Sequence, residues 1–77
     1  MMRWVRLESR VFRAARYIEE ARQLYLEFLS GAIYRYLDFP PHQYADFIAA
    51  DSHGRYFNRH IVGRFPEEQI RPPRNSR

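Results

Sequence analysis

Apolar and polar residues alternate in two neighbouring segments near the middle of the chain. In residues 23–28, Leu24, Leu26 and Phe28 alternate with polar or amphipathic side chains. Residues 32–37 form a second run rich in β-forming residues, directly after Ser30 and Gly31. Alternation with a period of two is typical of a half-buried β-strand. The pattern therefore predicts two antiparallel strands joined by a tight turn.

The length of this turn decides which side chains share a face. A two-residue loop would place Arg35 opposite Leu26, on the apolar face. A three-residue loop over residues 29–31, with Gly31 in the left-handed conformation of a bulge, opposes Leu26 to Tyr34, Leu24 to Tyr36 and Phe28 to Ala32. We favour this second register because it collects the apolar groups on one face. The other face then carries Tyr25, Glu27, Ile33 and Arg35, and we expect Glu27 to pair with Arg35 diagonally.

Residues 9–29 have a competing interpretation as one helix. Ser9 is a possible N-cap, Gly31 a possible C-cap, and many residues between them are good helix formers. The apolar side chains of this segment do not share a single helical face, however, so strands explain its second half better. Whether residues 9–17 form a strand, roughly from Val11 to Tyr17, or part of a helix stays open.

Two helices are predicted after the second strand. Pro40 and Pro41 suit a helical first turn, with the cap near Asp38 or Phe39, and the helix is expected from about residue 41 to residue 50. The residues expected to be buried by this helix are Tyr44, Phe47 and Ile48.

The second predicted helix is shorter and covers residues 55–61. Asp51 or Ser52 can cap it, and Phe57 and Ile61 would be its buried residues. Beyond Phe65, residues 66–77 are polar and interrupted by prolines, which predicts a mobile tail after a domain over residues 1–65.

Composition limits the chain to one small domain. It has 77 residues, 45% hydrophobic residues and no cysteine, so a core without disulfides must stabilise it. The predicted class is α+β, a small antiparallel meander of about three strands followed by two short helices. No apolar stretch approaches the roughly 20 residues that cross a bilayer, and the N-terminus lacks the apolar segment of a signal peptide. We therefore expect a cytoplasmic protein that does not contact membranes.

Charge is distributed unevenly along the chain. Residues 1–16 and 55–77 are rich in arginine, whereas residues 17–54 carry most of the acidic side chains, and no lysine is present. Two basic ends could meet in one anion-binding face, or they could simply neutralise an acidic middle. Arginine is well suited to bidentate phosphate contacts and to stacking on bases.

Neither catalysis nor metal binding is expected. Asp51, Ser52 and His53 contain the residue types of a hydrolase triad, but consecutive side chains cannot adopt its geometry, and helix capping explains the first two. His53 and His60 are about two helical turns apart, whereas zinc ligands on a helix usually sit three or four residues apart. We therefore predict a protein that is not an enzyme, with no catalytic residues, no metal site and no cofactor, and with histidines that form ordinary hydrogen bonds.

One block of the chain resembles the KTSC domain family. It comprises the Ser-Gly turn and Tyr-x-Tyr strand of residues 30–36, Phe39-Pro40, and the segment from Ala50 to Ile61 that contains Ser-His-Gly-x-Tyr-Phe-Asn-x-His-Ile. This family is named after a C-terminal extension of some lysyl-tRNA synthetases and also occurs as small free-standing bacterial proteins. The resemblance covers residues 9–65. It implies an antiparallel meander followed by two helices, with RNA binding as the usual suggestion for its role.

RNA binding is accordingly the favoured functional interpretation. The predicted RNA-binding residues interleave cations with rings: Arg35, Arg55, Tyr56, Arg59, His60 and Arg64. Arginines would contact phosphates, while exposed tyrosines could stack on unpaired bases. The alternative within this surface is a solvated arginine face with tyrosines at the rim of the core.

A protein-interaction module, such as an adaptor or a phage-type inhibitor, is the second functional hypothesis. Arginine, tyrosine and tryptophan dominate binding hot spots in protein interfaces. Trp4, Tyr25 and Ile33 would be the anchors if the second face of the sheet stays uncovered. The protein is expected to be a monomer, or a weak homodimer formed through an exposed strand edge.

Overall fold

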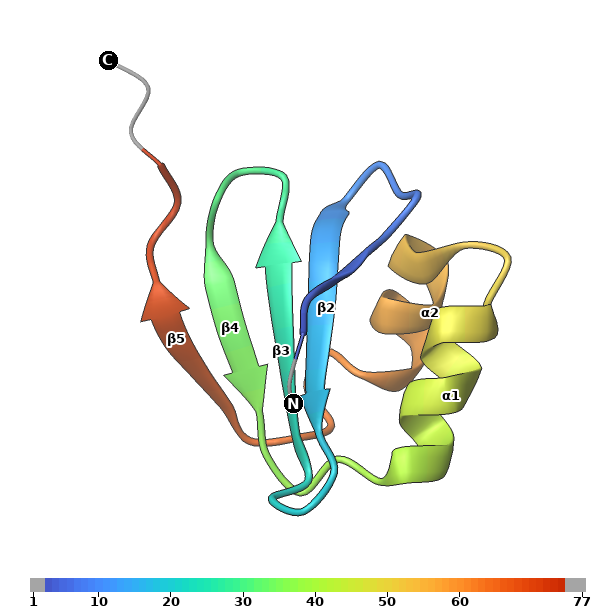
Figure 1. The fold of residues 1–77 in the computed structure, drawn as a ribbon. Coiled ribbons are helices and arrows are strands. Elements are labelled where there is room, and N and C mark those ends of the chain that lie inside the picture. Colours follow the sequence, from blue (N-terminus) through green and yellow to red (C-terminus); the bar gives the residue numbers. More distant parts are fainter. Residues whose placement is uncertain (1–2, 75–77) are drawn as a thin grey trace.

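Five antiparallel strands form one sheet whose order follows the chain, and two helices lie together on one side of it (Figure 1). The computed structural model describes residues 3–74. The strands are β1 (Val5–Arg6), β2 (Phe12–Ile18), β3 (Gln23–Phe28), β4 (Ile33–Tyr36) and β5 (Glu67–Arg71); α1 (Pro41–Ala49) and α2 (His53–His60) connect β4 to β5. The α+β class is therefore confirmed, whereas the prediction of about three strands is wrong, because β1 and β5 extend the meander to five.

The hairpin of β3 and β4 has the register that the three-residue loop predicts. Leu24 lies opposite Tyr36, and Leu26 lies opposite Tyr34. Gly31 closes the loop with a φ of 94°, a left-handed conformation that glycine adopts at little cost. The alternation of residues 23–28 therefore buries its apolar members on one face of the sheet.

The expected pairing of Glu27 with Arg35 is wrong. Glu27 accepts a hydrogen bond from Arg71 at 3.0 Å and lies 3.7 Å from Arg13, while Arg35 forms an ion pair with Glu68. The physical reason is β5, which lies beside β4 and brings Glu68 directly opposite Arg35.

The core lies between the sheet and the two helices. Its buried members are Phe12, Ala15, Leu24, Leu26, Tyr36, Phe39, Phe47 and Ile61. The helix α1 contributes Phe47 as predicted, with Tyr44 and Ile48 half-buried beside it. Its N-cap is Pro40 and makes no side-chain cap hydrogen bond, so the predicted cap near Asp38 or Phe39 is wrong. Within residues 3–74, neither helix has the length and apolarity that a membrane crossing requires.

The structure shows which conformation the segments near the two ends of the domain adopt. Residues 12–18 form a strand, which settles the open choice for residues 9–17 against a helix. Residues 67–71 form β5, paired with β4, so the prediction of a mobile tail is wrong for them. Residues 75–77 of the predicted tail lie outside the described residues. The last strand is held by its ladder and by Arg71, whose Nε donates to the Gly31 carbonyl at 2.9 Å.

Candidate nucleic-acid interface

The helix α2 positions most of the predicted RNA-binding residues. Ser52 is its N-cap, and the Ser52 hydroxyl oxygen accepts a hydrogen bond from the Arg55 amide at 3.2 Å. Phe57 packs against the core from α2, and Ile61, which follows the helix, is fully buried. With these residues facing inward, α2 directs Arg55, Asn58, Arg59 and His60 to solvent.

Four cations or potential cations are exposed on and just after α2. They are Arg55, Arg59, His60 and Arg64. Arg55 and Arg59 are one helical turn apart, so their side chains share one face. Among residues 3–74, no carboxylate lies within ion-pair distance of either guanidinium. The surface of α2 therefore offers free arginine side chains to an anion.

A shallow depression of about 140 Å³ accompanies these side chains. Its walls are formed by the end of α1, the connecting segment and α2: Ala50, Asp51, Ser52, Arg55, Tyr56, Arg59 and His60. Asp51 is exposed at its rim and places one negative charge beside the two arginines. The depression can accept a small group, such as a phosphate or the edge of a base, next to the guanidinium groups.

Tyr56 is not the exposed stacking platform that the sequence suggested as one option. Its ring lies 5.9 Å from the Phe47 ring and 4.6 Å from the His60 ring, centroid to centroid. Burial is the main cause that raises the pKa of Tyr56, with a smaller contribution from Asp46. Tyr56 therefore belongs to the rim of the core, and α2 presents guanidinium groups and an imidazole rather than a free phenol ring.

Arg35 lies on the opposite face of the sheet from α2. It is paired in register with Tyr25, on the face that the helices do not cover. Its Nε donates to Glu68 at 2.8 Å, and one terminal nitrogen donates to the Tyr25 hydroxyl at 3.1 Å. The hydrogen bonds to Tyr25 and then to Glu68 raise the pKa of Arg35. The structure therefore brings Arg55, Tyr56, Arg59 and His60 together around one depression, leaves Arg64 exposed after the helix, and places Arg35 on the other face of the sheet.

The uncovered face carries an arrangement that the sequence did not reveal. One side chain from each strand region forms a line across the sheet, and we call this line the aromatic–arginine row: Trp4, Arg16, Tyr25, Arg35 and Glu68. A sequence signal existed in part, because Tyr25 and Arg35 are opposed in the predicted hairpin. Trp4 was expected on this face as an anchor beside Tyr25, and its ring does meet the Tyr25 ring. Arg16 and Glu68 could not be added, since β5 was not predicted and β2 was left open.

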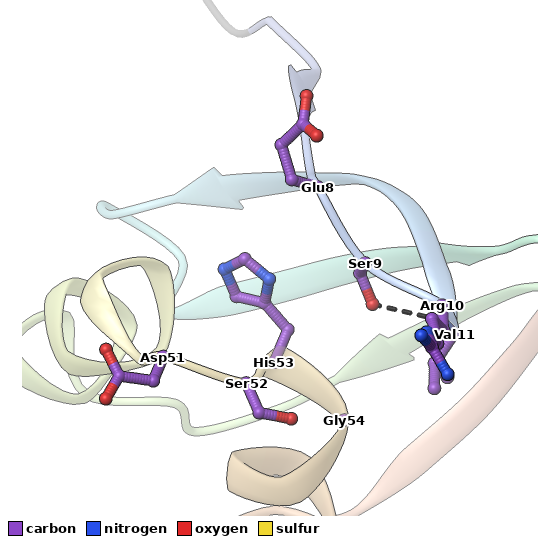
Figure 2. A pocket seen from close by; sticks show the side chains of 8 residues that line it. All are labelled: Glu8, Ser9, Arg10, Val11, Asp51, Ser52, His53 and Gly54. Atoms are coloured by element: carbon purple, nitrogen blue, oxygen red, sulfur yellow. Dashed lines mark hydrogen bonds between the residues drawn. The ribbon is translucent and has the colours of Figure 1, made fainter.

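A second pocket, of about 420 Å³, lies where the loop before β2 meets the start of α2 (Figure 2). Its lining includes Asp51, Ser52 and His53, whose side chains point in three different directions. Ser52 is engaged as the cap of α2, and the His53 Nε2 lies 3.3 Å from the Ile48 carbonyl oxygen. A hydrolase triad requires the acid, the base and the nucleophile in one hydrogen-bonded chain. These three residues do not have that geometry.

The histidines do not gather around a common point. His42 and His60 are exposed, whereas His53 is half-buried with its ring 5.3 Å from the Phe47 ring. Across residues 3–74, no group of three or more histidine, cysteine, aspartate or glutamate side chains could hold a metal ion.

Comparison with known proteins identifies relatives of the whole domain. The family model of the KTSC domain matches residues 8–65. An uncharacterized protein of Stutzerimonas stutzeri is 43% identical over 58 residues, which are 75% of this chain and 82% of that protein. A lysine–tRNA ligase of Nostoc punctiforme is 36% identical over 63 residues, 82% of this chain, but the match spans only 11% of the ligase. The crystal structure of a KTSC domain protein from Yersinia pestis superposes with a TM-score of 0.87 at 28% identity, covering 91% of this chain and 99% of that one.

Proposed function

The chain belongs to the KTSC domain family, and we propose that it is a small non-enzymatic module that binds RNA through the exposed arginines of α2. The observation that carries the proposal is the pair formed by Arg55 and Arg59. Both are exposed on one helical face, and no carboxylate among residues 3–74 pairs with them. Free guanidinium groups can bind phosphate oxygens without first losing an ion pair.

The charges of the uncovered sheet face make it the weaker candidate for RNA. Arg35 is already paired with Glu68, and Arg71 is already paired with Glu27. A phosphate that approached these arginines would meet both carboxylates. Two exposed acids, Asp51 and Asp46, lie near the surface of α2, but neither is within ion-pair distance of Arg55 or Arg59.

The mode of binding that α2 supports is directed at the phosphate backbone. Its rings are not free for stacking, because Tyr56 is packed at the rim of the core. Contacts to phosphates fix position and carry no direct sequence information, so we expect recognition of RNA shape rather than sequence. Two relatives are lysine–tRNA ligases, which by their name act on tRNA. This favours a structured RNA as the ligand.

The test compares two double variants with the same loss of charge. Arg55→Ala with Arg59→Ala removes the α2 pair, and Arg3→Ala with Arg6→Ala removes two exposed arginines at and before β1. Affinity for a fluorescent RNA hairpin is measured between 50 and 200 mM salt. We expect the α2 variant to bind more weakly and its salt slope to flatten by roughly 0.7 to 0.9 for each phosphate that is no longer neutralised. The thermal midpoints should stay close to that of the parent, because exposed arginines contribute little to stability.

Two results would contradict the proposal. An affinity weaker than about 100 μM at physiological salt would be at the weak end of non-specific binding and would remove the RNA function. Equal decreases in affinity for the two double variants would show that only net charge matters and that α2 is not the binding surface.

A further inference from the structure

The face of the sheet opposite the helices is a second surface with its own chemistry. In Figure 1 both helices lie on one side, and the N-terminal segment with β1 runs in front of β2, so neither helix covers the other side within residues 3–74. The aromatic–arginine row crosses this uncovered face. The strand registers align its members: Arg16 opposes Tyr25, Tyr25 opposes Arg35, and Arg35 opposes Glu68.

Arg16 is held between two aromatic rings. The centre of its guanidinium lies 6.0 Å from the Trp4 ring centroid and 5.5 Å from the Tyr25 ring centroid. The two rings meet edge to face, with their centroids 6.4 Å apart. Aromatic rings attract a cation through their negative faces and also shield it from water. Arg16 is therefore fixed in place and partly desolvated.

The two arginines of the row differ in whether their hydrogen bonds are satisfied. Arg35 donates to Glu68 and to the Tyr25 hydroxyl. The Arg16 Nε is buried without a hydrogen-bond partner, and Arg16 takes part in no ion pair among residues 3–74. A buried donor without an acceptor is unfavourable, more so when the group is charged. Arg16 thus lacks the carboxylate that Arg35 has.

Apolar surface adjoins this unpaired cation. The Trp4 side chain is 38% exposed, and Ile33 is half-buried on the same face, opposite Glu27 in the register. Tryptophan, tyrosine and arginine are the residues that most often dominate protein interfaces. The combination favours a ligand that presents one anionic group beside an apolar group.

We propose that the uncovered sheet face docks an acidic segment of another protein, with a carboxylate of that segment on Arg16 and an apolar side chain against Trp4. Charge complementarity favours a segment with one carboxylate as the ligand of this face, rather than a nucleic acid. Glu27 and Glu68 lie on this face and would repel a chain of phosphates, whereas a single carboxylate can reach Arg16 alone. The Tyr25 ring already has Arg16 and Arg35 over it, so it offers no platform for stacking bases. This inference is independent of RNA binding, because α2 lies on the other side of the sheet.

The experiment uses two synthetic peptides and the intrinsic fluorescence of the protein. Trp4 is the one tryptophan in the chain, so its emission reports events at this face directly. The probes are a blocked ten-residue peptide of serine and glycine that carries one glutamate followed by one leucine, and its counterpart with glutamine in place of the glutamate. We expect the acidic peptide to shift the Trp4 emission in a saturable way and the neutral peptide to bind at least about tenfold more weakly, as for loss of a charge partner in a protein interface.

Variants of the chain complete the test. Arg16→Gln should weaken binding of the acidic peptide at least about tenfold, and Arg55→Ala with Arg59→Ala should leave it unchanged. If Arg16→Gln does not fold, the comparison of the two peptides on the parent protein still tests the proposal. Equal binding of both peptides, no binding of the acidic peptide up to 1 mM, or equal binding by Arg16→Gln would each overturn the proposal. An RNA oligonucleotide that shifts the Trp4 emission and loses its effect in Arg16→Gln would assign this face to RNA instead.

Discussion

Replacing Leu26 with alanine tests the packing that defines the fold. Leu26 lies in the centre of β3, between Ala15 on β2 and Tyr34 on β4, and its side chain is fully buried. Alanine keeps the strand and removes three carbon atoms from the core. The space that they leave is lined by the sheet and by core aromatic residues, which cannot collapse into it without giving up their own packing.

The expected cost is large relative to the stability of so small a domain. Substitutions of buried leucine by alanine cost about 2 to 5 kcal/mol, through reduced burial and the cavity that remains. A chain of this length has a free energy of unfolding of about 4 to 12 kcal/mol. A loss of about 3 kcal/mol should lower the thermal midpoint by about 12 to 24 °C in a domain of this size. Leu26→Asp, which would bury a carboxylate without a partner, should abolish folding.

The measurement is urea unfolding followed by far-UV circular dichroism, with Leu29→Ala as the matched control. Leu29 follows β3 directly and is 47% exposed, so the same chemical change there should cost less than about 1 kcal/mol. A cost below about 1 kcal/mol for Leu26→Ala, or equal costs for the two variants, would refute the placement of Leu26 on the packed face.

Two further predictions concern pH and the turns. Burial, followed by the charge of Glu67, raises the pKa of Tyr36 above the value of about 10 for an exposed tyrosine, so the unfolded chain loses its phenol proton first as the pH rises. The free energy of unfolding should therefore fall progressively as the pH rises above about 10, and by less in Tyr36→Phe. Equal decreases in parent and variant would contradict the assignment to this residue. Gly31→Ala should destabilise more than Gly63→Ala in the same urea assay: both glycines have positive φ, but a Cβ at Gly31 would lie 2.9 Å from the Arg74 side chain, whereas at Gly63 it would meet nothing within 4 Å. Equal costs would show that the Arg74 side chain simply moves aside.

The central hairpin and both helices could be predicted from the sequence, because local physical rules decide them. Alternation in residues 23–28 and a glycine that can adopt positive φ fix the turn and the register together. The prolines at 40 and 41 and the cap at Ser52 mark where the helices start, to within two residues. In each case the deciding residues lie within a few positions of the element that they define.

The edge strands could not be predicted in this way. Residues Val5–Arg6 form a strand of only two residues, and Glu67–Arg71 is polar at nearly every position without an apolar alternation. Strands of this kind exist because a neighbour supplies their hydrogen bonds, so their stability depends on a partner far away in the sequence. The contacts of Glu68 with Arg35 and of Arg71 with Glu27 join residues 33 and 44 positions apart.

The sequence by itself determined which residues could bind an anion, and the tertiary structure decided which of them can act together. Arg55, Arg59 and His60 are close in the chain on one helix, so their common surface follows from helical geometry. Arg35 has the same chemistry but lies across the sheet, where Glu68 pairs with it. Arg16 has its place between Trp4 and Tyr25 through the register of three strands. Side-chain chemistry is local, whereas pairing and burial depend on contacts between distant segments, and only the folded chain brings those segments together.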